Sequence, residues 1–165
     1  MTGAAGIEKT YLKVRGRWCY LYRAIDRDGN LVDTMLSEHR DMAAAQAFFR
    51  SAMSVTGQVP ERVTTDGHGS YPRAIRSTLG RRVVHRTSAY KNNGLEQDHR
   101  GVKGRTRCMR GFKSFISAER FCRSHDELRD FLRPRTRHNQ PVSASRRRLL
   151  HLRRATAALA ILEAE

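Results

Sequence analysis

The sequence predicts an α/β fold in which a mixed sheet, three antiparallel strands followed by parallel strands, is flanked by helices. Three observations support this fold class. Residues 11–36 contain three aromatic and β-branched segments that are separated by turn signals. An amphipathic helical pattern follows them. Short strand-like and helix-like segments then alternate as far as residue 85.

The antiparallel part is expected first. Strands are predicted at residues 11–14, 18–25 and 31–36. The Arg-Gly-Arg sequence at 15–17 joins the first two strands as a hairpin, and Asp-Arg-Asp-Gly-Asn at 26–30 is a strong turn signal before the third. Connections this short require neighbouring strands to run antiparallel.

The next segment is predicted to be a helix. It begins at Asp41, an N-cap residue, and ends near Gly57, because apolar side chains recur between them at helical spacing. A strand, a short helix and another strand are then expected at 62–65, 71–79 and 82–85.

The C-terminal part is predicted to be helical and basic. One helix begins around Leu95, and another covers 117–132 and stops before Pro134. A last helix is expected at 145–163. We therefore expect one domain over residues 1–133, followed by a basic linker and C-terminal helix over 134–165. The apolar face of the helix at 117–132 is expected to hold Phe121, Cys122, Leu128 and Leu132.

The charge balance indicates the class of partner. The 165 residues carry 32 Lys and Arg against 16 Asp and Glu, a formal net charge of +16. A basic surface releases counterions from a phosphate backbone, so nucleic acid is predicted ahead of an acidic membrane surface or a merely solubilising role. No apolar run is long enough to cross a bilayer, and three cysteines without metal-site spacing fit a reducing cytoplasm.

Three acidic residues are candidate catalytic metal ligands. Glu8 is placed at the start of the first strand, Asp66 at the end of the fourth and Glu96 at the start of a helix. Ligands of open α/β sheets bind beyond strand ends, where distant carboxylates can converge and hold Mg²⁺ for phosphoryl transfer. The alternatives are a turn residue at Asp66, a first-turn helix carboxylate at Glu96 and a solvated Glu8.

Several blocks of the sequence resemble one family of bacterial transposases. One block reads Thr-Thr-Asp-Gly-His at 64–68, and another reads Leu-Glu-Gln-Asp-His-Arg-Gly-Val-Lys at 95–103. On these blocks the chain resembles the insertion-sequence-six family, whose DDE domains are also grouped as IS240-type. The resemblance covers nearly the whole chain. The remaining blocks lie at 11–29, 70–72, 92–93, 109–112 and 131–135.

The resemblance implies a ribonuclease H-like fold and an Asp–Asp–Glu triad that binds Mg²⁺, with Mn²⁺ as a substitute. Asp66 and Glu96 match the second and third members. Lys103, seven positions after Glu96, lies on the same helix face, where a DNA phosphate contact is implied, with Arg100 and Arg105 beside it. The implied activity is cleavage of DNA at transposon ends and strand transfer into target DNA, by a homo-oligomer at the bacterial nucleoid in the cytoplasm.

The chain departs from the family at two places. Where the family reads Val-Asp-Glu-Thr-Tyr, residues 7–11 read Ile-Glu-Lys-Thr-Tyr. Glu8 thus replaces the first Asp and is expected to be a compromised third ligand, since a misplacement of roughly 1 Å can cost about a hundredfold in rate. Lys9 alternates to the other strand face and need not enter the site. The family's N-terminal helix-turn-helix is expected to be lacking, because only residues 1–6 precede the first expected strand block.

Two other functions stay open at this point. One is an inactive transposase remnant that binds DNA non-specifically, and the other is a basic nucleic-acid-binding structural protein. His68 and His99 adjoin the expected triad and are candidates to touch substrate or orient a carboxylate. The alternation of Trp18 and nearby tyrosines fits either a base-stacking platform or a half-buried strand.

Overall fold

The structure is a computed structural model that describes residues 4–27, 30–88, 102–106, 111–132 and isolated positions between 145 and 160. The chain divides into two compact units, Met1–Asp126 and Glu127–Glu165. The predicted boundary after residue 133 falls outside the described residues and stays a prediction.

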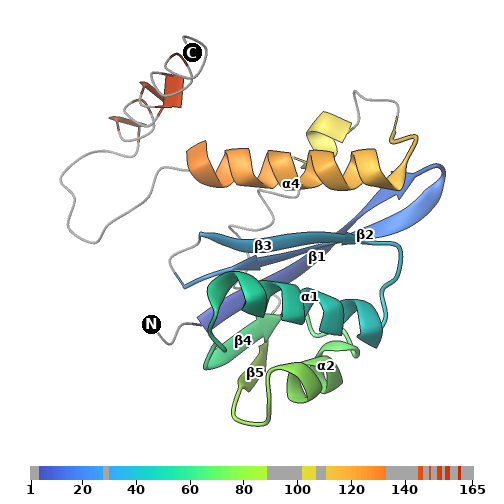
Figure 1. Ribbon diagram of the computed structural model, residues 1–165, viewed down its shortest axis with the longest axis vertical. Coiled ribbons are helices and arrows are strands. Elements are labelled where there is room, and N and C mark those ends of the chain that lie inside the picture. The colour runs from blue at the N-terminus through green and yellow to red at the C-terminus, as the bar shows by residue number, and fades with distance from the viewer. Residues whose placement is uncertain are drawn as a thin grey trace. The chain divides into compact units, whose positions relative to one another are not determined.

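A five-stranded mixed sheet forms the centre of the first unit (Figure 1). Its order is β3-β2-β1-β4-β5. β1, β2 and β3 pair antiparallel, whereas β4 pairs parallel to β1 and β5 parallel to β4. The predicted mixed sheet is therefore confirmed. The strands are β1 (Ala4–Val14), β2 (Arg17–Ile25), β3 (Leu31–Ser37), β4 (Arg62–Thr65) and β5 (Val84–Thr87).

β1 is longer than the sequence pattern predicts. It begins at Ala4 rather than at residue 11, so Glu8 lies inside the strand and not at its start. Small and charged residues such as Gly6 and Lys9 have low strand propensity, which hides this half of β1 in the sequence. Pairing on both sides, with β2 and with β4, overrides that propensity.

The turn between β1 and β2 and the start of β5 can be compared with the predictions. Arg15 and Gly16 both have positive φ, 50° and 77°, as a tight hairpin between β1 and β2 requires. The last strand was predicted at 82–85 but begins two residues later, because the parallel register pairs Arg62 with Val84. The predicted hairpin is confirmed, and the predicted start of the last strand is wrong by two residues.

The helices after β3 follow the predicted signals. In α1 (Met42–Thr56), the Asp41 side chain caps the first turn by accepting from the Ala44 amide at 2.8 Å. Gly57 ends the helix in the left-handed conformation, with φ of 65°. The short α2 (Tyr71–Thr78) has proline in its first turn, as predicted.

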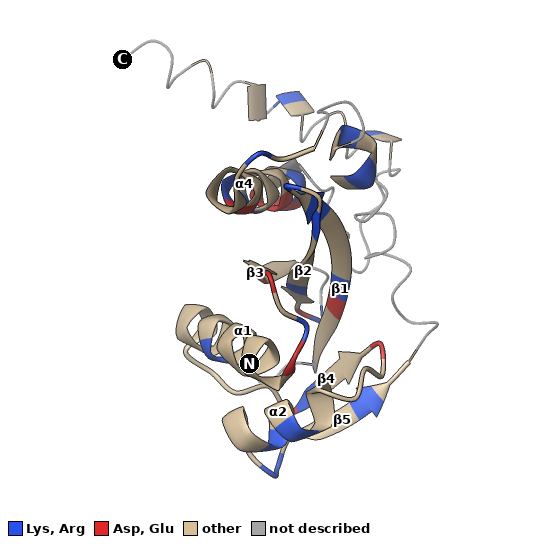
Figure 2. Cartoon of the chain, turned by 90° about the vertical axis from the view of Figure 1, so that its right-hand side faces the viewer, with Lys and Arg blue, Asp and Glu red and all other residues tan. Residues whose placement is uncertain are grey.

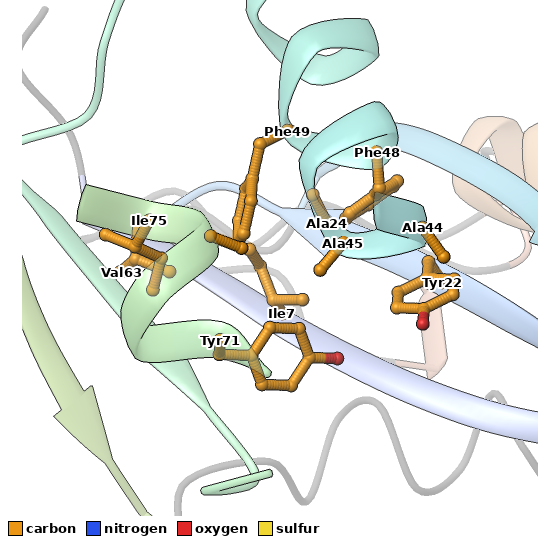
Figure 3. Close-up of a cluster of buried hydrophobic side chains, with 11 residues drawn as sticks. Ile7, Tyr22, Ala24, Ala44, Ala45, Phe48, Phe49, Val63, Tyr71 and Ile75 are labelled. Atoms are coloured by element: carbon orange, nitrogen blue, oxygen red, sulfur yellow. The ribbon is translucent and has the colours of Figure 1, made fainter. Parts of the chain in front are cut away.

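Two apolar cores lie on opposite faces of the sheet, since alternate residues of β1 and β2 belong to different cores. One core packs α1 and α2 against the sheet (Figure 3). The other joins the β1–β2 hairpin to α4 (Phe115–Leu132), whose buried residues Ala118, Cys122 and Asp126 recur every four positions. Leu128, predicted on the apolar face, is 55% exposed instead. None of the helices in the described part of the chain is long and apolar enough to span a bilayer.

Candidate active site

The parallel pairing of β1 and β4 positions the two described carboxylates of the expected triad. Asp66 follows directly after β4, which ends at Thr65. In the register of the two strands Gly6 is paired with Thr64, so two residues further along Glu8 lies level with Asp66. The two carboxylates therefore come from adjacent chain segments at the C-terminal end of β4, where α/β sheets bind ligands.

Glu8 and Lys9 point to opposite faces of the sheet. Glu8 is 7% exposed and pairs across the ladder with Arg23, on the face covered by α4. Lys9 pairs with Tyr22 on the face covered by α1 and α2, and its Nζ lies 5.3 Å from the centre of the Tyr71 ring. The predicted alternation is correct, and it brings Lys9 against α2.

The pKa shifts of Tyr71 and Lys9 indicate which charges act on these two side chains. Burial raises the pKa of Tyr71, and the negative charge of Asp66 and, more weakly, that of Glu8 raise it further. Burial lowers the pKa of Lys9, against the opposing effect of Asp66. Both carboxylates thus act on the Tyr71 hydroxyl, and the Lys9 ammonium interacts with Asp66. Whether Lys9 affects metal binding at this end of the sheet stays a prediction.

Three buried polar atoms belong to residues on the face of the sheet that α1 and α2 cover. Lys9 Nζ, the Tyr22 hydroxyl and the Tyr71 hydroxyl have no hydrogen-bond partner among the described residues. Burial, followed by the charge of Asp41, raises the pKa of Tyr22 to about 12, so its hydroxyl stays protonated.

His68 organises the loop that carries Asp66. Its backbone amide donates to Asp66 Oδ1 at 3.2 Å, and its ring Nε2 accepts from Arg40 Nε at 2.9 Å. The other ring nitrogen lies 2.8 Å from Ser70 Oγ. Burial and the nearby Lys9 and Arg40 charges lower the pKa of His68, which keeps the ring neutral. The Ser70 backbone amide also donates to Nδ1 at 3.4 Å, so the side chain and the backbone of Ser70 both contact this ring nitrogen.

Sequence reasoning missed the part that Arg40, Tyr22 and Tyr71 play at this end of the sheet. Arg40 reaches His68 from the connection between β3 and α1, and only the tertiary structure brings these two residues together. Tyr71 follows the Asp66 loop directly, so its place in the matched block at 70–72 was the available signal. Tyr22 gave no signal beyond the alternation of its strand.

The remaining predicted site residues are only partly described. Glu96, His99 and Arg100 lie outside the described residues. Lys103 and Arg105 are exposed on the helical segment 102–106, and Lys103 Nζ lies 4.8 Å from the centre of the Tyr11 ring. Within the described ranges, no three His, Cys, Asp or Glu side chains are grouped closely enough to bind a metal. The full triad therefore stays a prediction.

Comparison with known proteins identifies the family. A family model described as a DDE domain, of the IS240 transposase type, matches residues 4–134. The chain belongs to this DDE-domain family. The transposase for insertion sequence-like element IS431mec of Staphylococcus aureus (strain Mu50 / ATCC 700699) is 40% identical over 103 residues, which is 60% of this chain and 46% of that protein. The S. aureus transposase for IS257 in transposon Tn4003 gives the same values. This DDE-domain chain thus spans about half the length of the curated relatives that it matches.

Solved structures confirm the ribonuclease H-like fold that was expected for a DDE domain. A chain of the simian T-cell lymphotropic virus intasome in complex with the PP2A regulatory subunit B56 gamma superposes with a TM-score of 0.55 at 13% identity, covering 91% of this chain and 54% of that chain. The HTLV-2 integrase catalytic core domain in complex with magnesium, in its trimeric form, gives 0.51 at 14% identity, covering 91% and 96%. At these identities the likeness concerns the fold alone.

Proposed function

We propose that the protein is a transposase that cuts DNA at the ends of an insertion sequence and joins the freed 3′-hydroxyl to target DNA. One observation carries the proposal: Asp66 follows β4 level with Glu8 of β1, in a chain that belongs to the DDE-domain family. Two carboxylates on adjacent segments at a strand end are what the first half of such a site needs.

The donor chemistry of these residues fits Mg²⁺, with Mn²⁺ as a substitute. Asp66, Glu96 and Glu8 would supply the hard carboxylate oxygens that Mg²⁺ prefers. A bound ion would lower the pKa of the attacking hydroxyl and stabilise the leaving oxygen. The chain's own residues orient the site, since His68 holds the Asp66 loop and Arg40 holds His68.

Basic residues would hold the DNA around this acidic site. Figure 2 shows Lys and Arg spread over α2 and β5 as well as the central strands. We assign phosphate contacts to Lys103, Arg100 and Arg105. The partners are the transposon ends and the target DNA, the assembly is a homo-oligomer, and the place of action is the bacterial nucleoid.

A second candidate function is an inactive remnant that binds DNA non-specifically. The observation that favours it is the Lys9 ammonium, whose charge acts on Asp66 where the family resemblance implies a second acidic residue. A cation there opposes metal binding, and Glu8 extends its carboxylate one methylene beyond the usual aspartate. Both departures lie in the same five residues of β1.

Strand transfer on a preformed branched DNA tests the two candidates, because this substrate bypasses recognition of the element ends. Wild type, Glu8→Asp and Glu96→Gln are compared in Mg²⁺ and in Mn²⁺. Wild-type activity that disappears in Glu96→Gln supports a working triad that includes Glu8. A silent wild type rescued by Glu8→Asp indicates an intact scaffold disabled at one ligand. If none of the three proteins shows strand transfer although each is folded and binds DNA, the transposase proposal is refuted and the inactive remnant is supported.

A further inference from the structure

Two aromatic side chains stand exposed at the far end of the β1–β2 hairpin. Tyr11 is 52% exposed and Trp18 is 51% exposed. Their rings meet edge to face, with centroids 5.2 Å apart and planes at 87°. Each ring is therefore fixed by the other while much of its surface remains in contact with solvent.

A lysine lies over each of these rings. Lys13 Nζ is 4.9 Å from the centre of the Trp18 ring, and Lys103 Nζ is 4.8 Å from the centre of the Tyr11 ring. Lys13 and Trp18 are direct partners in the β1–β2 ladder, whereas Lys103 comes from the helical segment 102–106. We call Tyr11, Lys13, Trp18 and Lys103 the aromatic–lysine cluster. It borders an open cavity of about 680 Å³ that Thr10, Val102 and Phe112 also line.

We propose that the aromatic–lysine cluster binds an unpaired nucleotide of a DNA strand, with the base stacked on Trp18 or Tyr11 and the flanking phosphates held by Lys13 and Lys103. Aromatic rings stack on any base, and interleaved cations hold the backbone. The contact of an exposed lysine with an aromatic ring is weak, so either ammonium can leave its ring for a phosphate. The proposal rests on DNA as the substrate and adds a subsite for single-stranded DNA away from Glu8 and Asp66.

The position of the cluster relates it to the acidic end of the sheet. Tyr11 and Lys13 follow Lys9 on the same face of β1, at every second residue. Four residues of strand separate Lys9 from Lys13, roughly 13 Å at about 3.3 Å per residue. A stacked DNA strand advances about 3.4 Å per nucleotide, so this length corresponds to about four nucleotides. A strand that reacts beside Asp66 is therefore expected to present a nucleotide about four positions away to Trp18.

Trp18 is the only tryptophan of the chain, so its fluorescence reports on this subsite directly. We expect a single-stranded thymidine oligonucleotide to quench Trp18 emission on binding to the full chain. A blunt duplex of equal length, compared at the same fraction bound, should quench it much less. Total binding is followed separately, by the anisotropy of a dye at the far end of each DNA. No magnesium is needed for this measurement.

Variants separate stacking from general charge. Trp18→Ala should weaken binding of the single strand roughly tenfold and Trp18→Phe much less, because phenylalanine keeps a ring on which a base stacks. Lys13→Gln and Tyr11→Ala should lower the quenching of Trp18. Arg50→Gln on the exposed side of α1, which removes one equal charge elsewhere, should leave the quenching unchanged.

Each outcome bears on one proposal. DNA that binds without changing Trp18 emission, or duplex that quenches as strongly as single strand, overturns the subsite and leaves the transposase proposal intact. Trp18→Ala that binds single strands as tightly as wild type also overturns it, provided that circular dichroism shows a folded variant. An absence of any DNA binding by anisotropy refutes the proposed function itself.

Discussion

Arg23 of β2 and Asp126 of α4 form a buried two-point ion pair. Arg23 Nε lies 2.6 Å from Asp126 Oδ2, and Nη2 lies 2.8 Å from Oδ1. Thr34 of β3 donates to the same carboxylate at 2.9 Å. Arg23 also pairs with Glu8 in the β1–β2 ladder. The contact therefore fixes α4 against the strands at the position of the first candidate ligand.

Removing the charge of Asp126 should destabilise the fold. In Asp126→Asn, the buried Arg23 guanidinium loses its counterion, and such losses cost about 3 kcal/mol or more. The free energy of unfolding is measured by urea denaturation. Glu127→Gln, at the exposed neighbouring position of α4, is the matched control and should change stability by less than about 0.5 kcal/mol. Equal effects of the two substitutions would mean that the ion pair contributes nothing measurable.

The same ion pair predicts a pH dependence of stability. Burial acts to raise the pKa of Asp126, but contacts with His125, Arg23 and Thr34 outweigh it and hold the pKa below its ordinary value. A carboxyl with a lowered pKa in the folded state stabilises the fold fully above its unfolded pKa of about 3.9, and the contribution is lost as pH falls through the folded pKa. Wild type should therefore lose more stability than Asp126→Asn between about pH 5 and pH 2. Parallel urea curves across this range for both proteins would refute the assignment.

Replacing Lys9 by the acidic residue of the family should strengthen metal binding. Lys9→Glu exchanges a cation whose charge acts on Asp66 for a carboxylate, and even about 1 kcal/mol of relieved repulsion between cation and metal corresponds to roughly fivefold in affinity. Isothermal titration with Mn²⁺ measures the change without requiring activity. Arg50→Glu makes the same change of charge on the outside of α1 and should have little effect. Equal affinity in Lys9→Glu and wild type would place Lys9 outside the metal site.

The buried hydroxyls of Tyr22 and Tyr71 should contribute nothing to stability. Neither has a hydrogen-bond partner among the described residues, although both rings belong to the core beneath α1 and α2 (Figure 3). Removing an unsatisfied hydroxyl while keeping the ring is neutral or stabilising. Tyr71→Phe and Tyr22→Phe should unfold at the same urea concentration as wild type or higher. A loss above about 1 kcal/mol would show that the hydroxyl is bonded, for example to an ordered water.

Much of the fold could be predicted because its signals are local. Asp41 and Gly57 mark the ends of α1 by their own capping chemistry, and a glycine-containing turn marks the β1–β2 hairpin. The first half of β1 could not be predicted, because its small and charged residues become a central strand only through pairing with β2 and β4. The burial of Leu128 was predicted wrongly, because helical spacing alone does not show which apolar side chains of a helix are covered.

The sequence by itself determined the order of strands and helices and the basic character, since composition and spacing carry these features. Its resemblance to the transposase family singled out the carboxylates Glu8 and Asp66 as candidates. Only the tertiary structure decided which side chains meet. The parallel register of β1 and β4 brings Glu8 level with Asp66, and the alternation of β1 turns Lys9 toward Tyr71. Residues far apart in the chain become neighbours only when the strands pair. The register of a pair depends on both strands, so neither strand's sequence determines it alone.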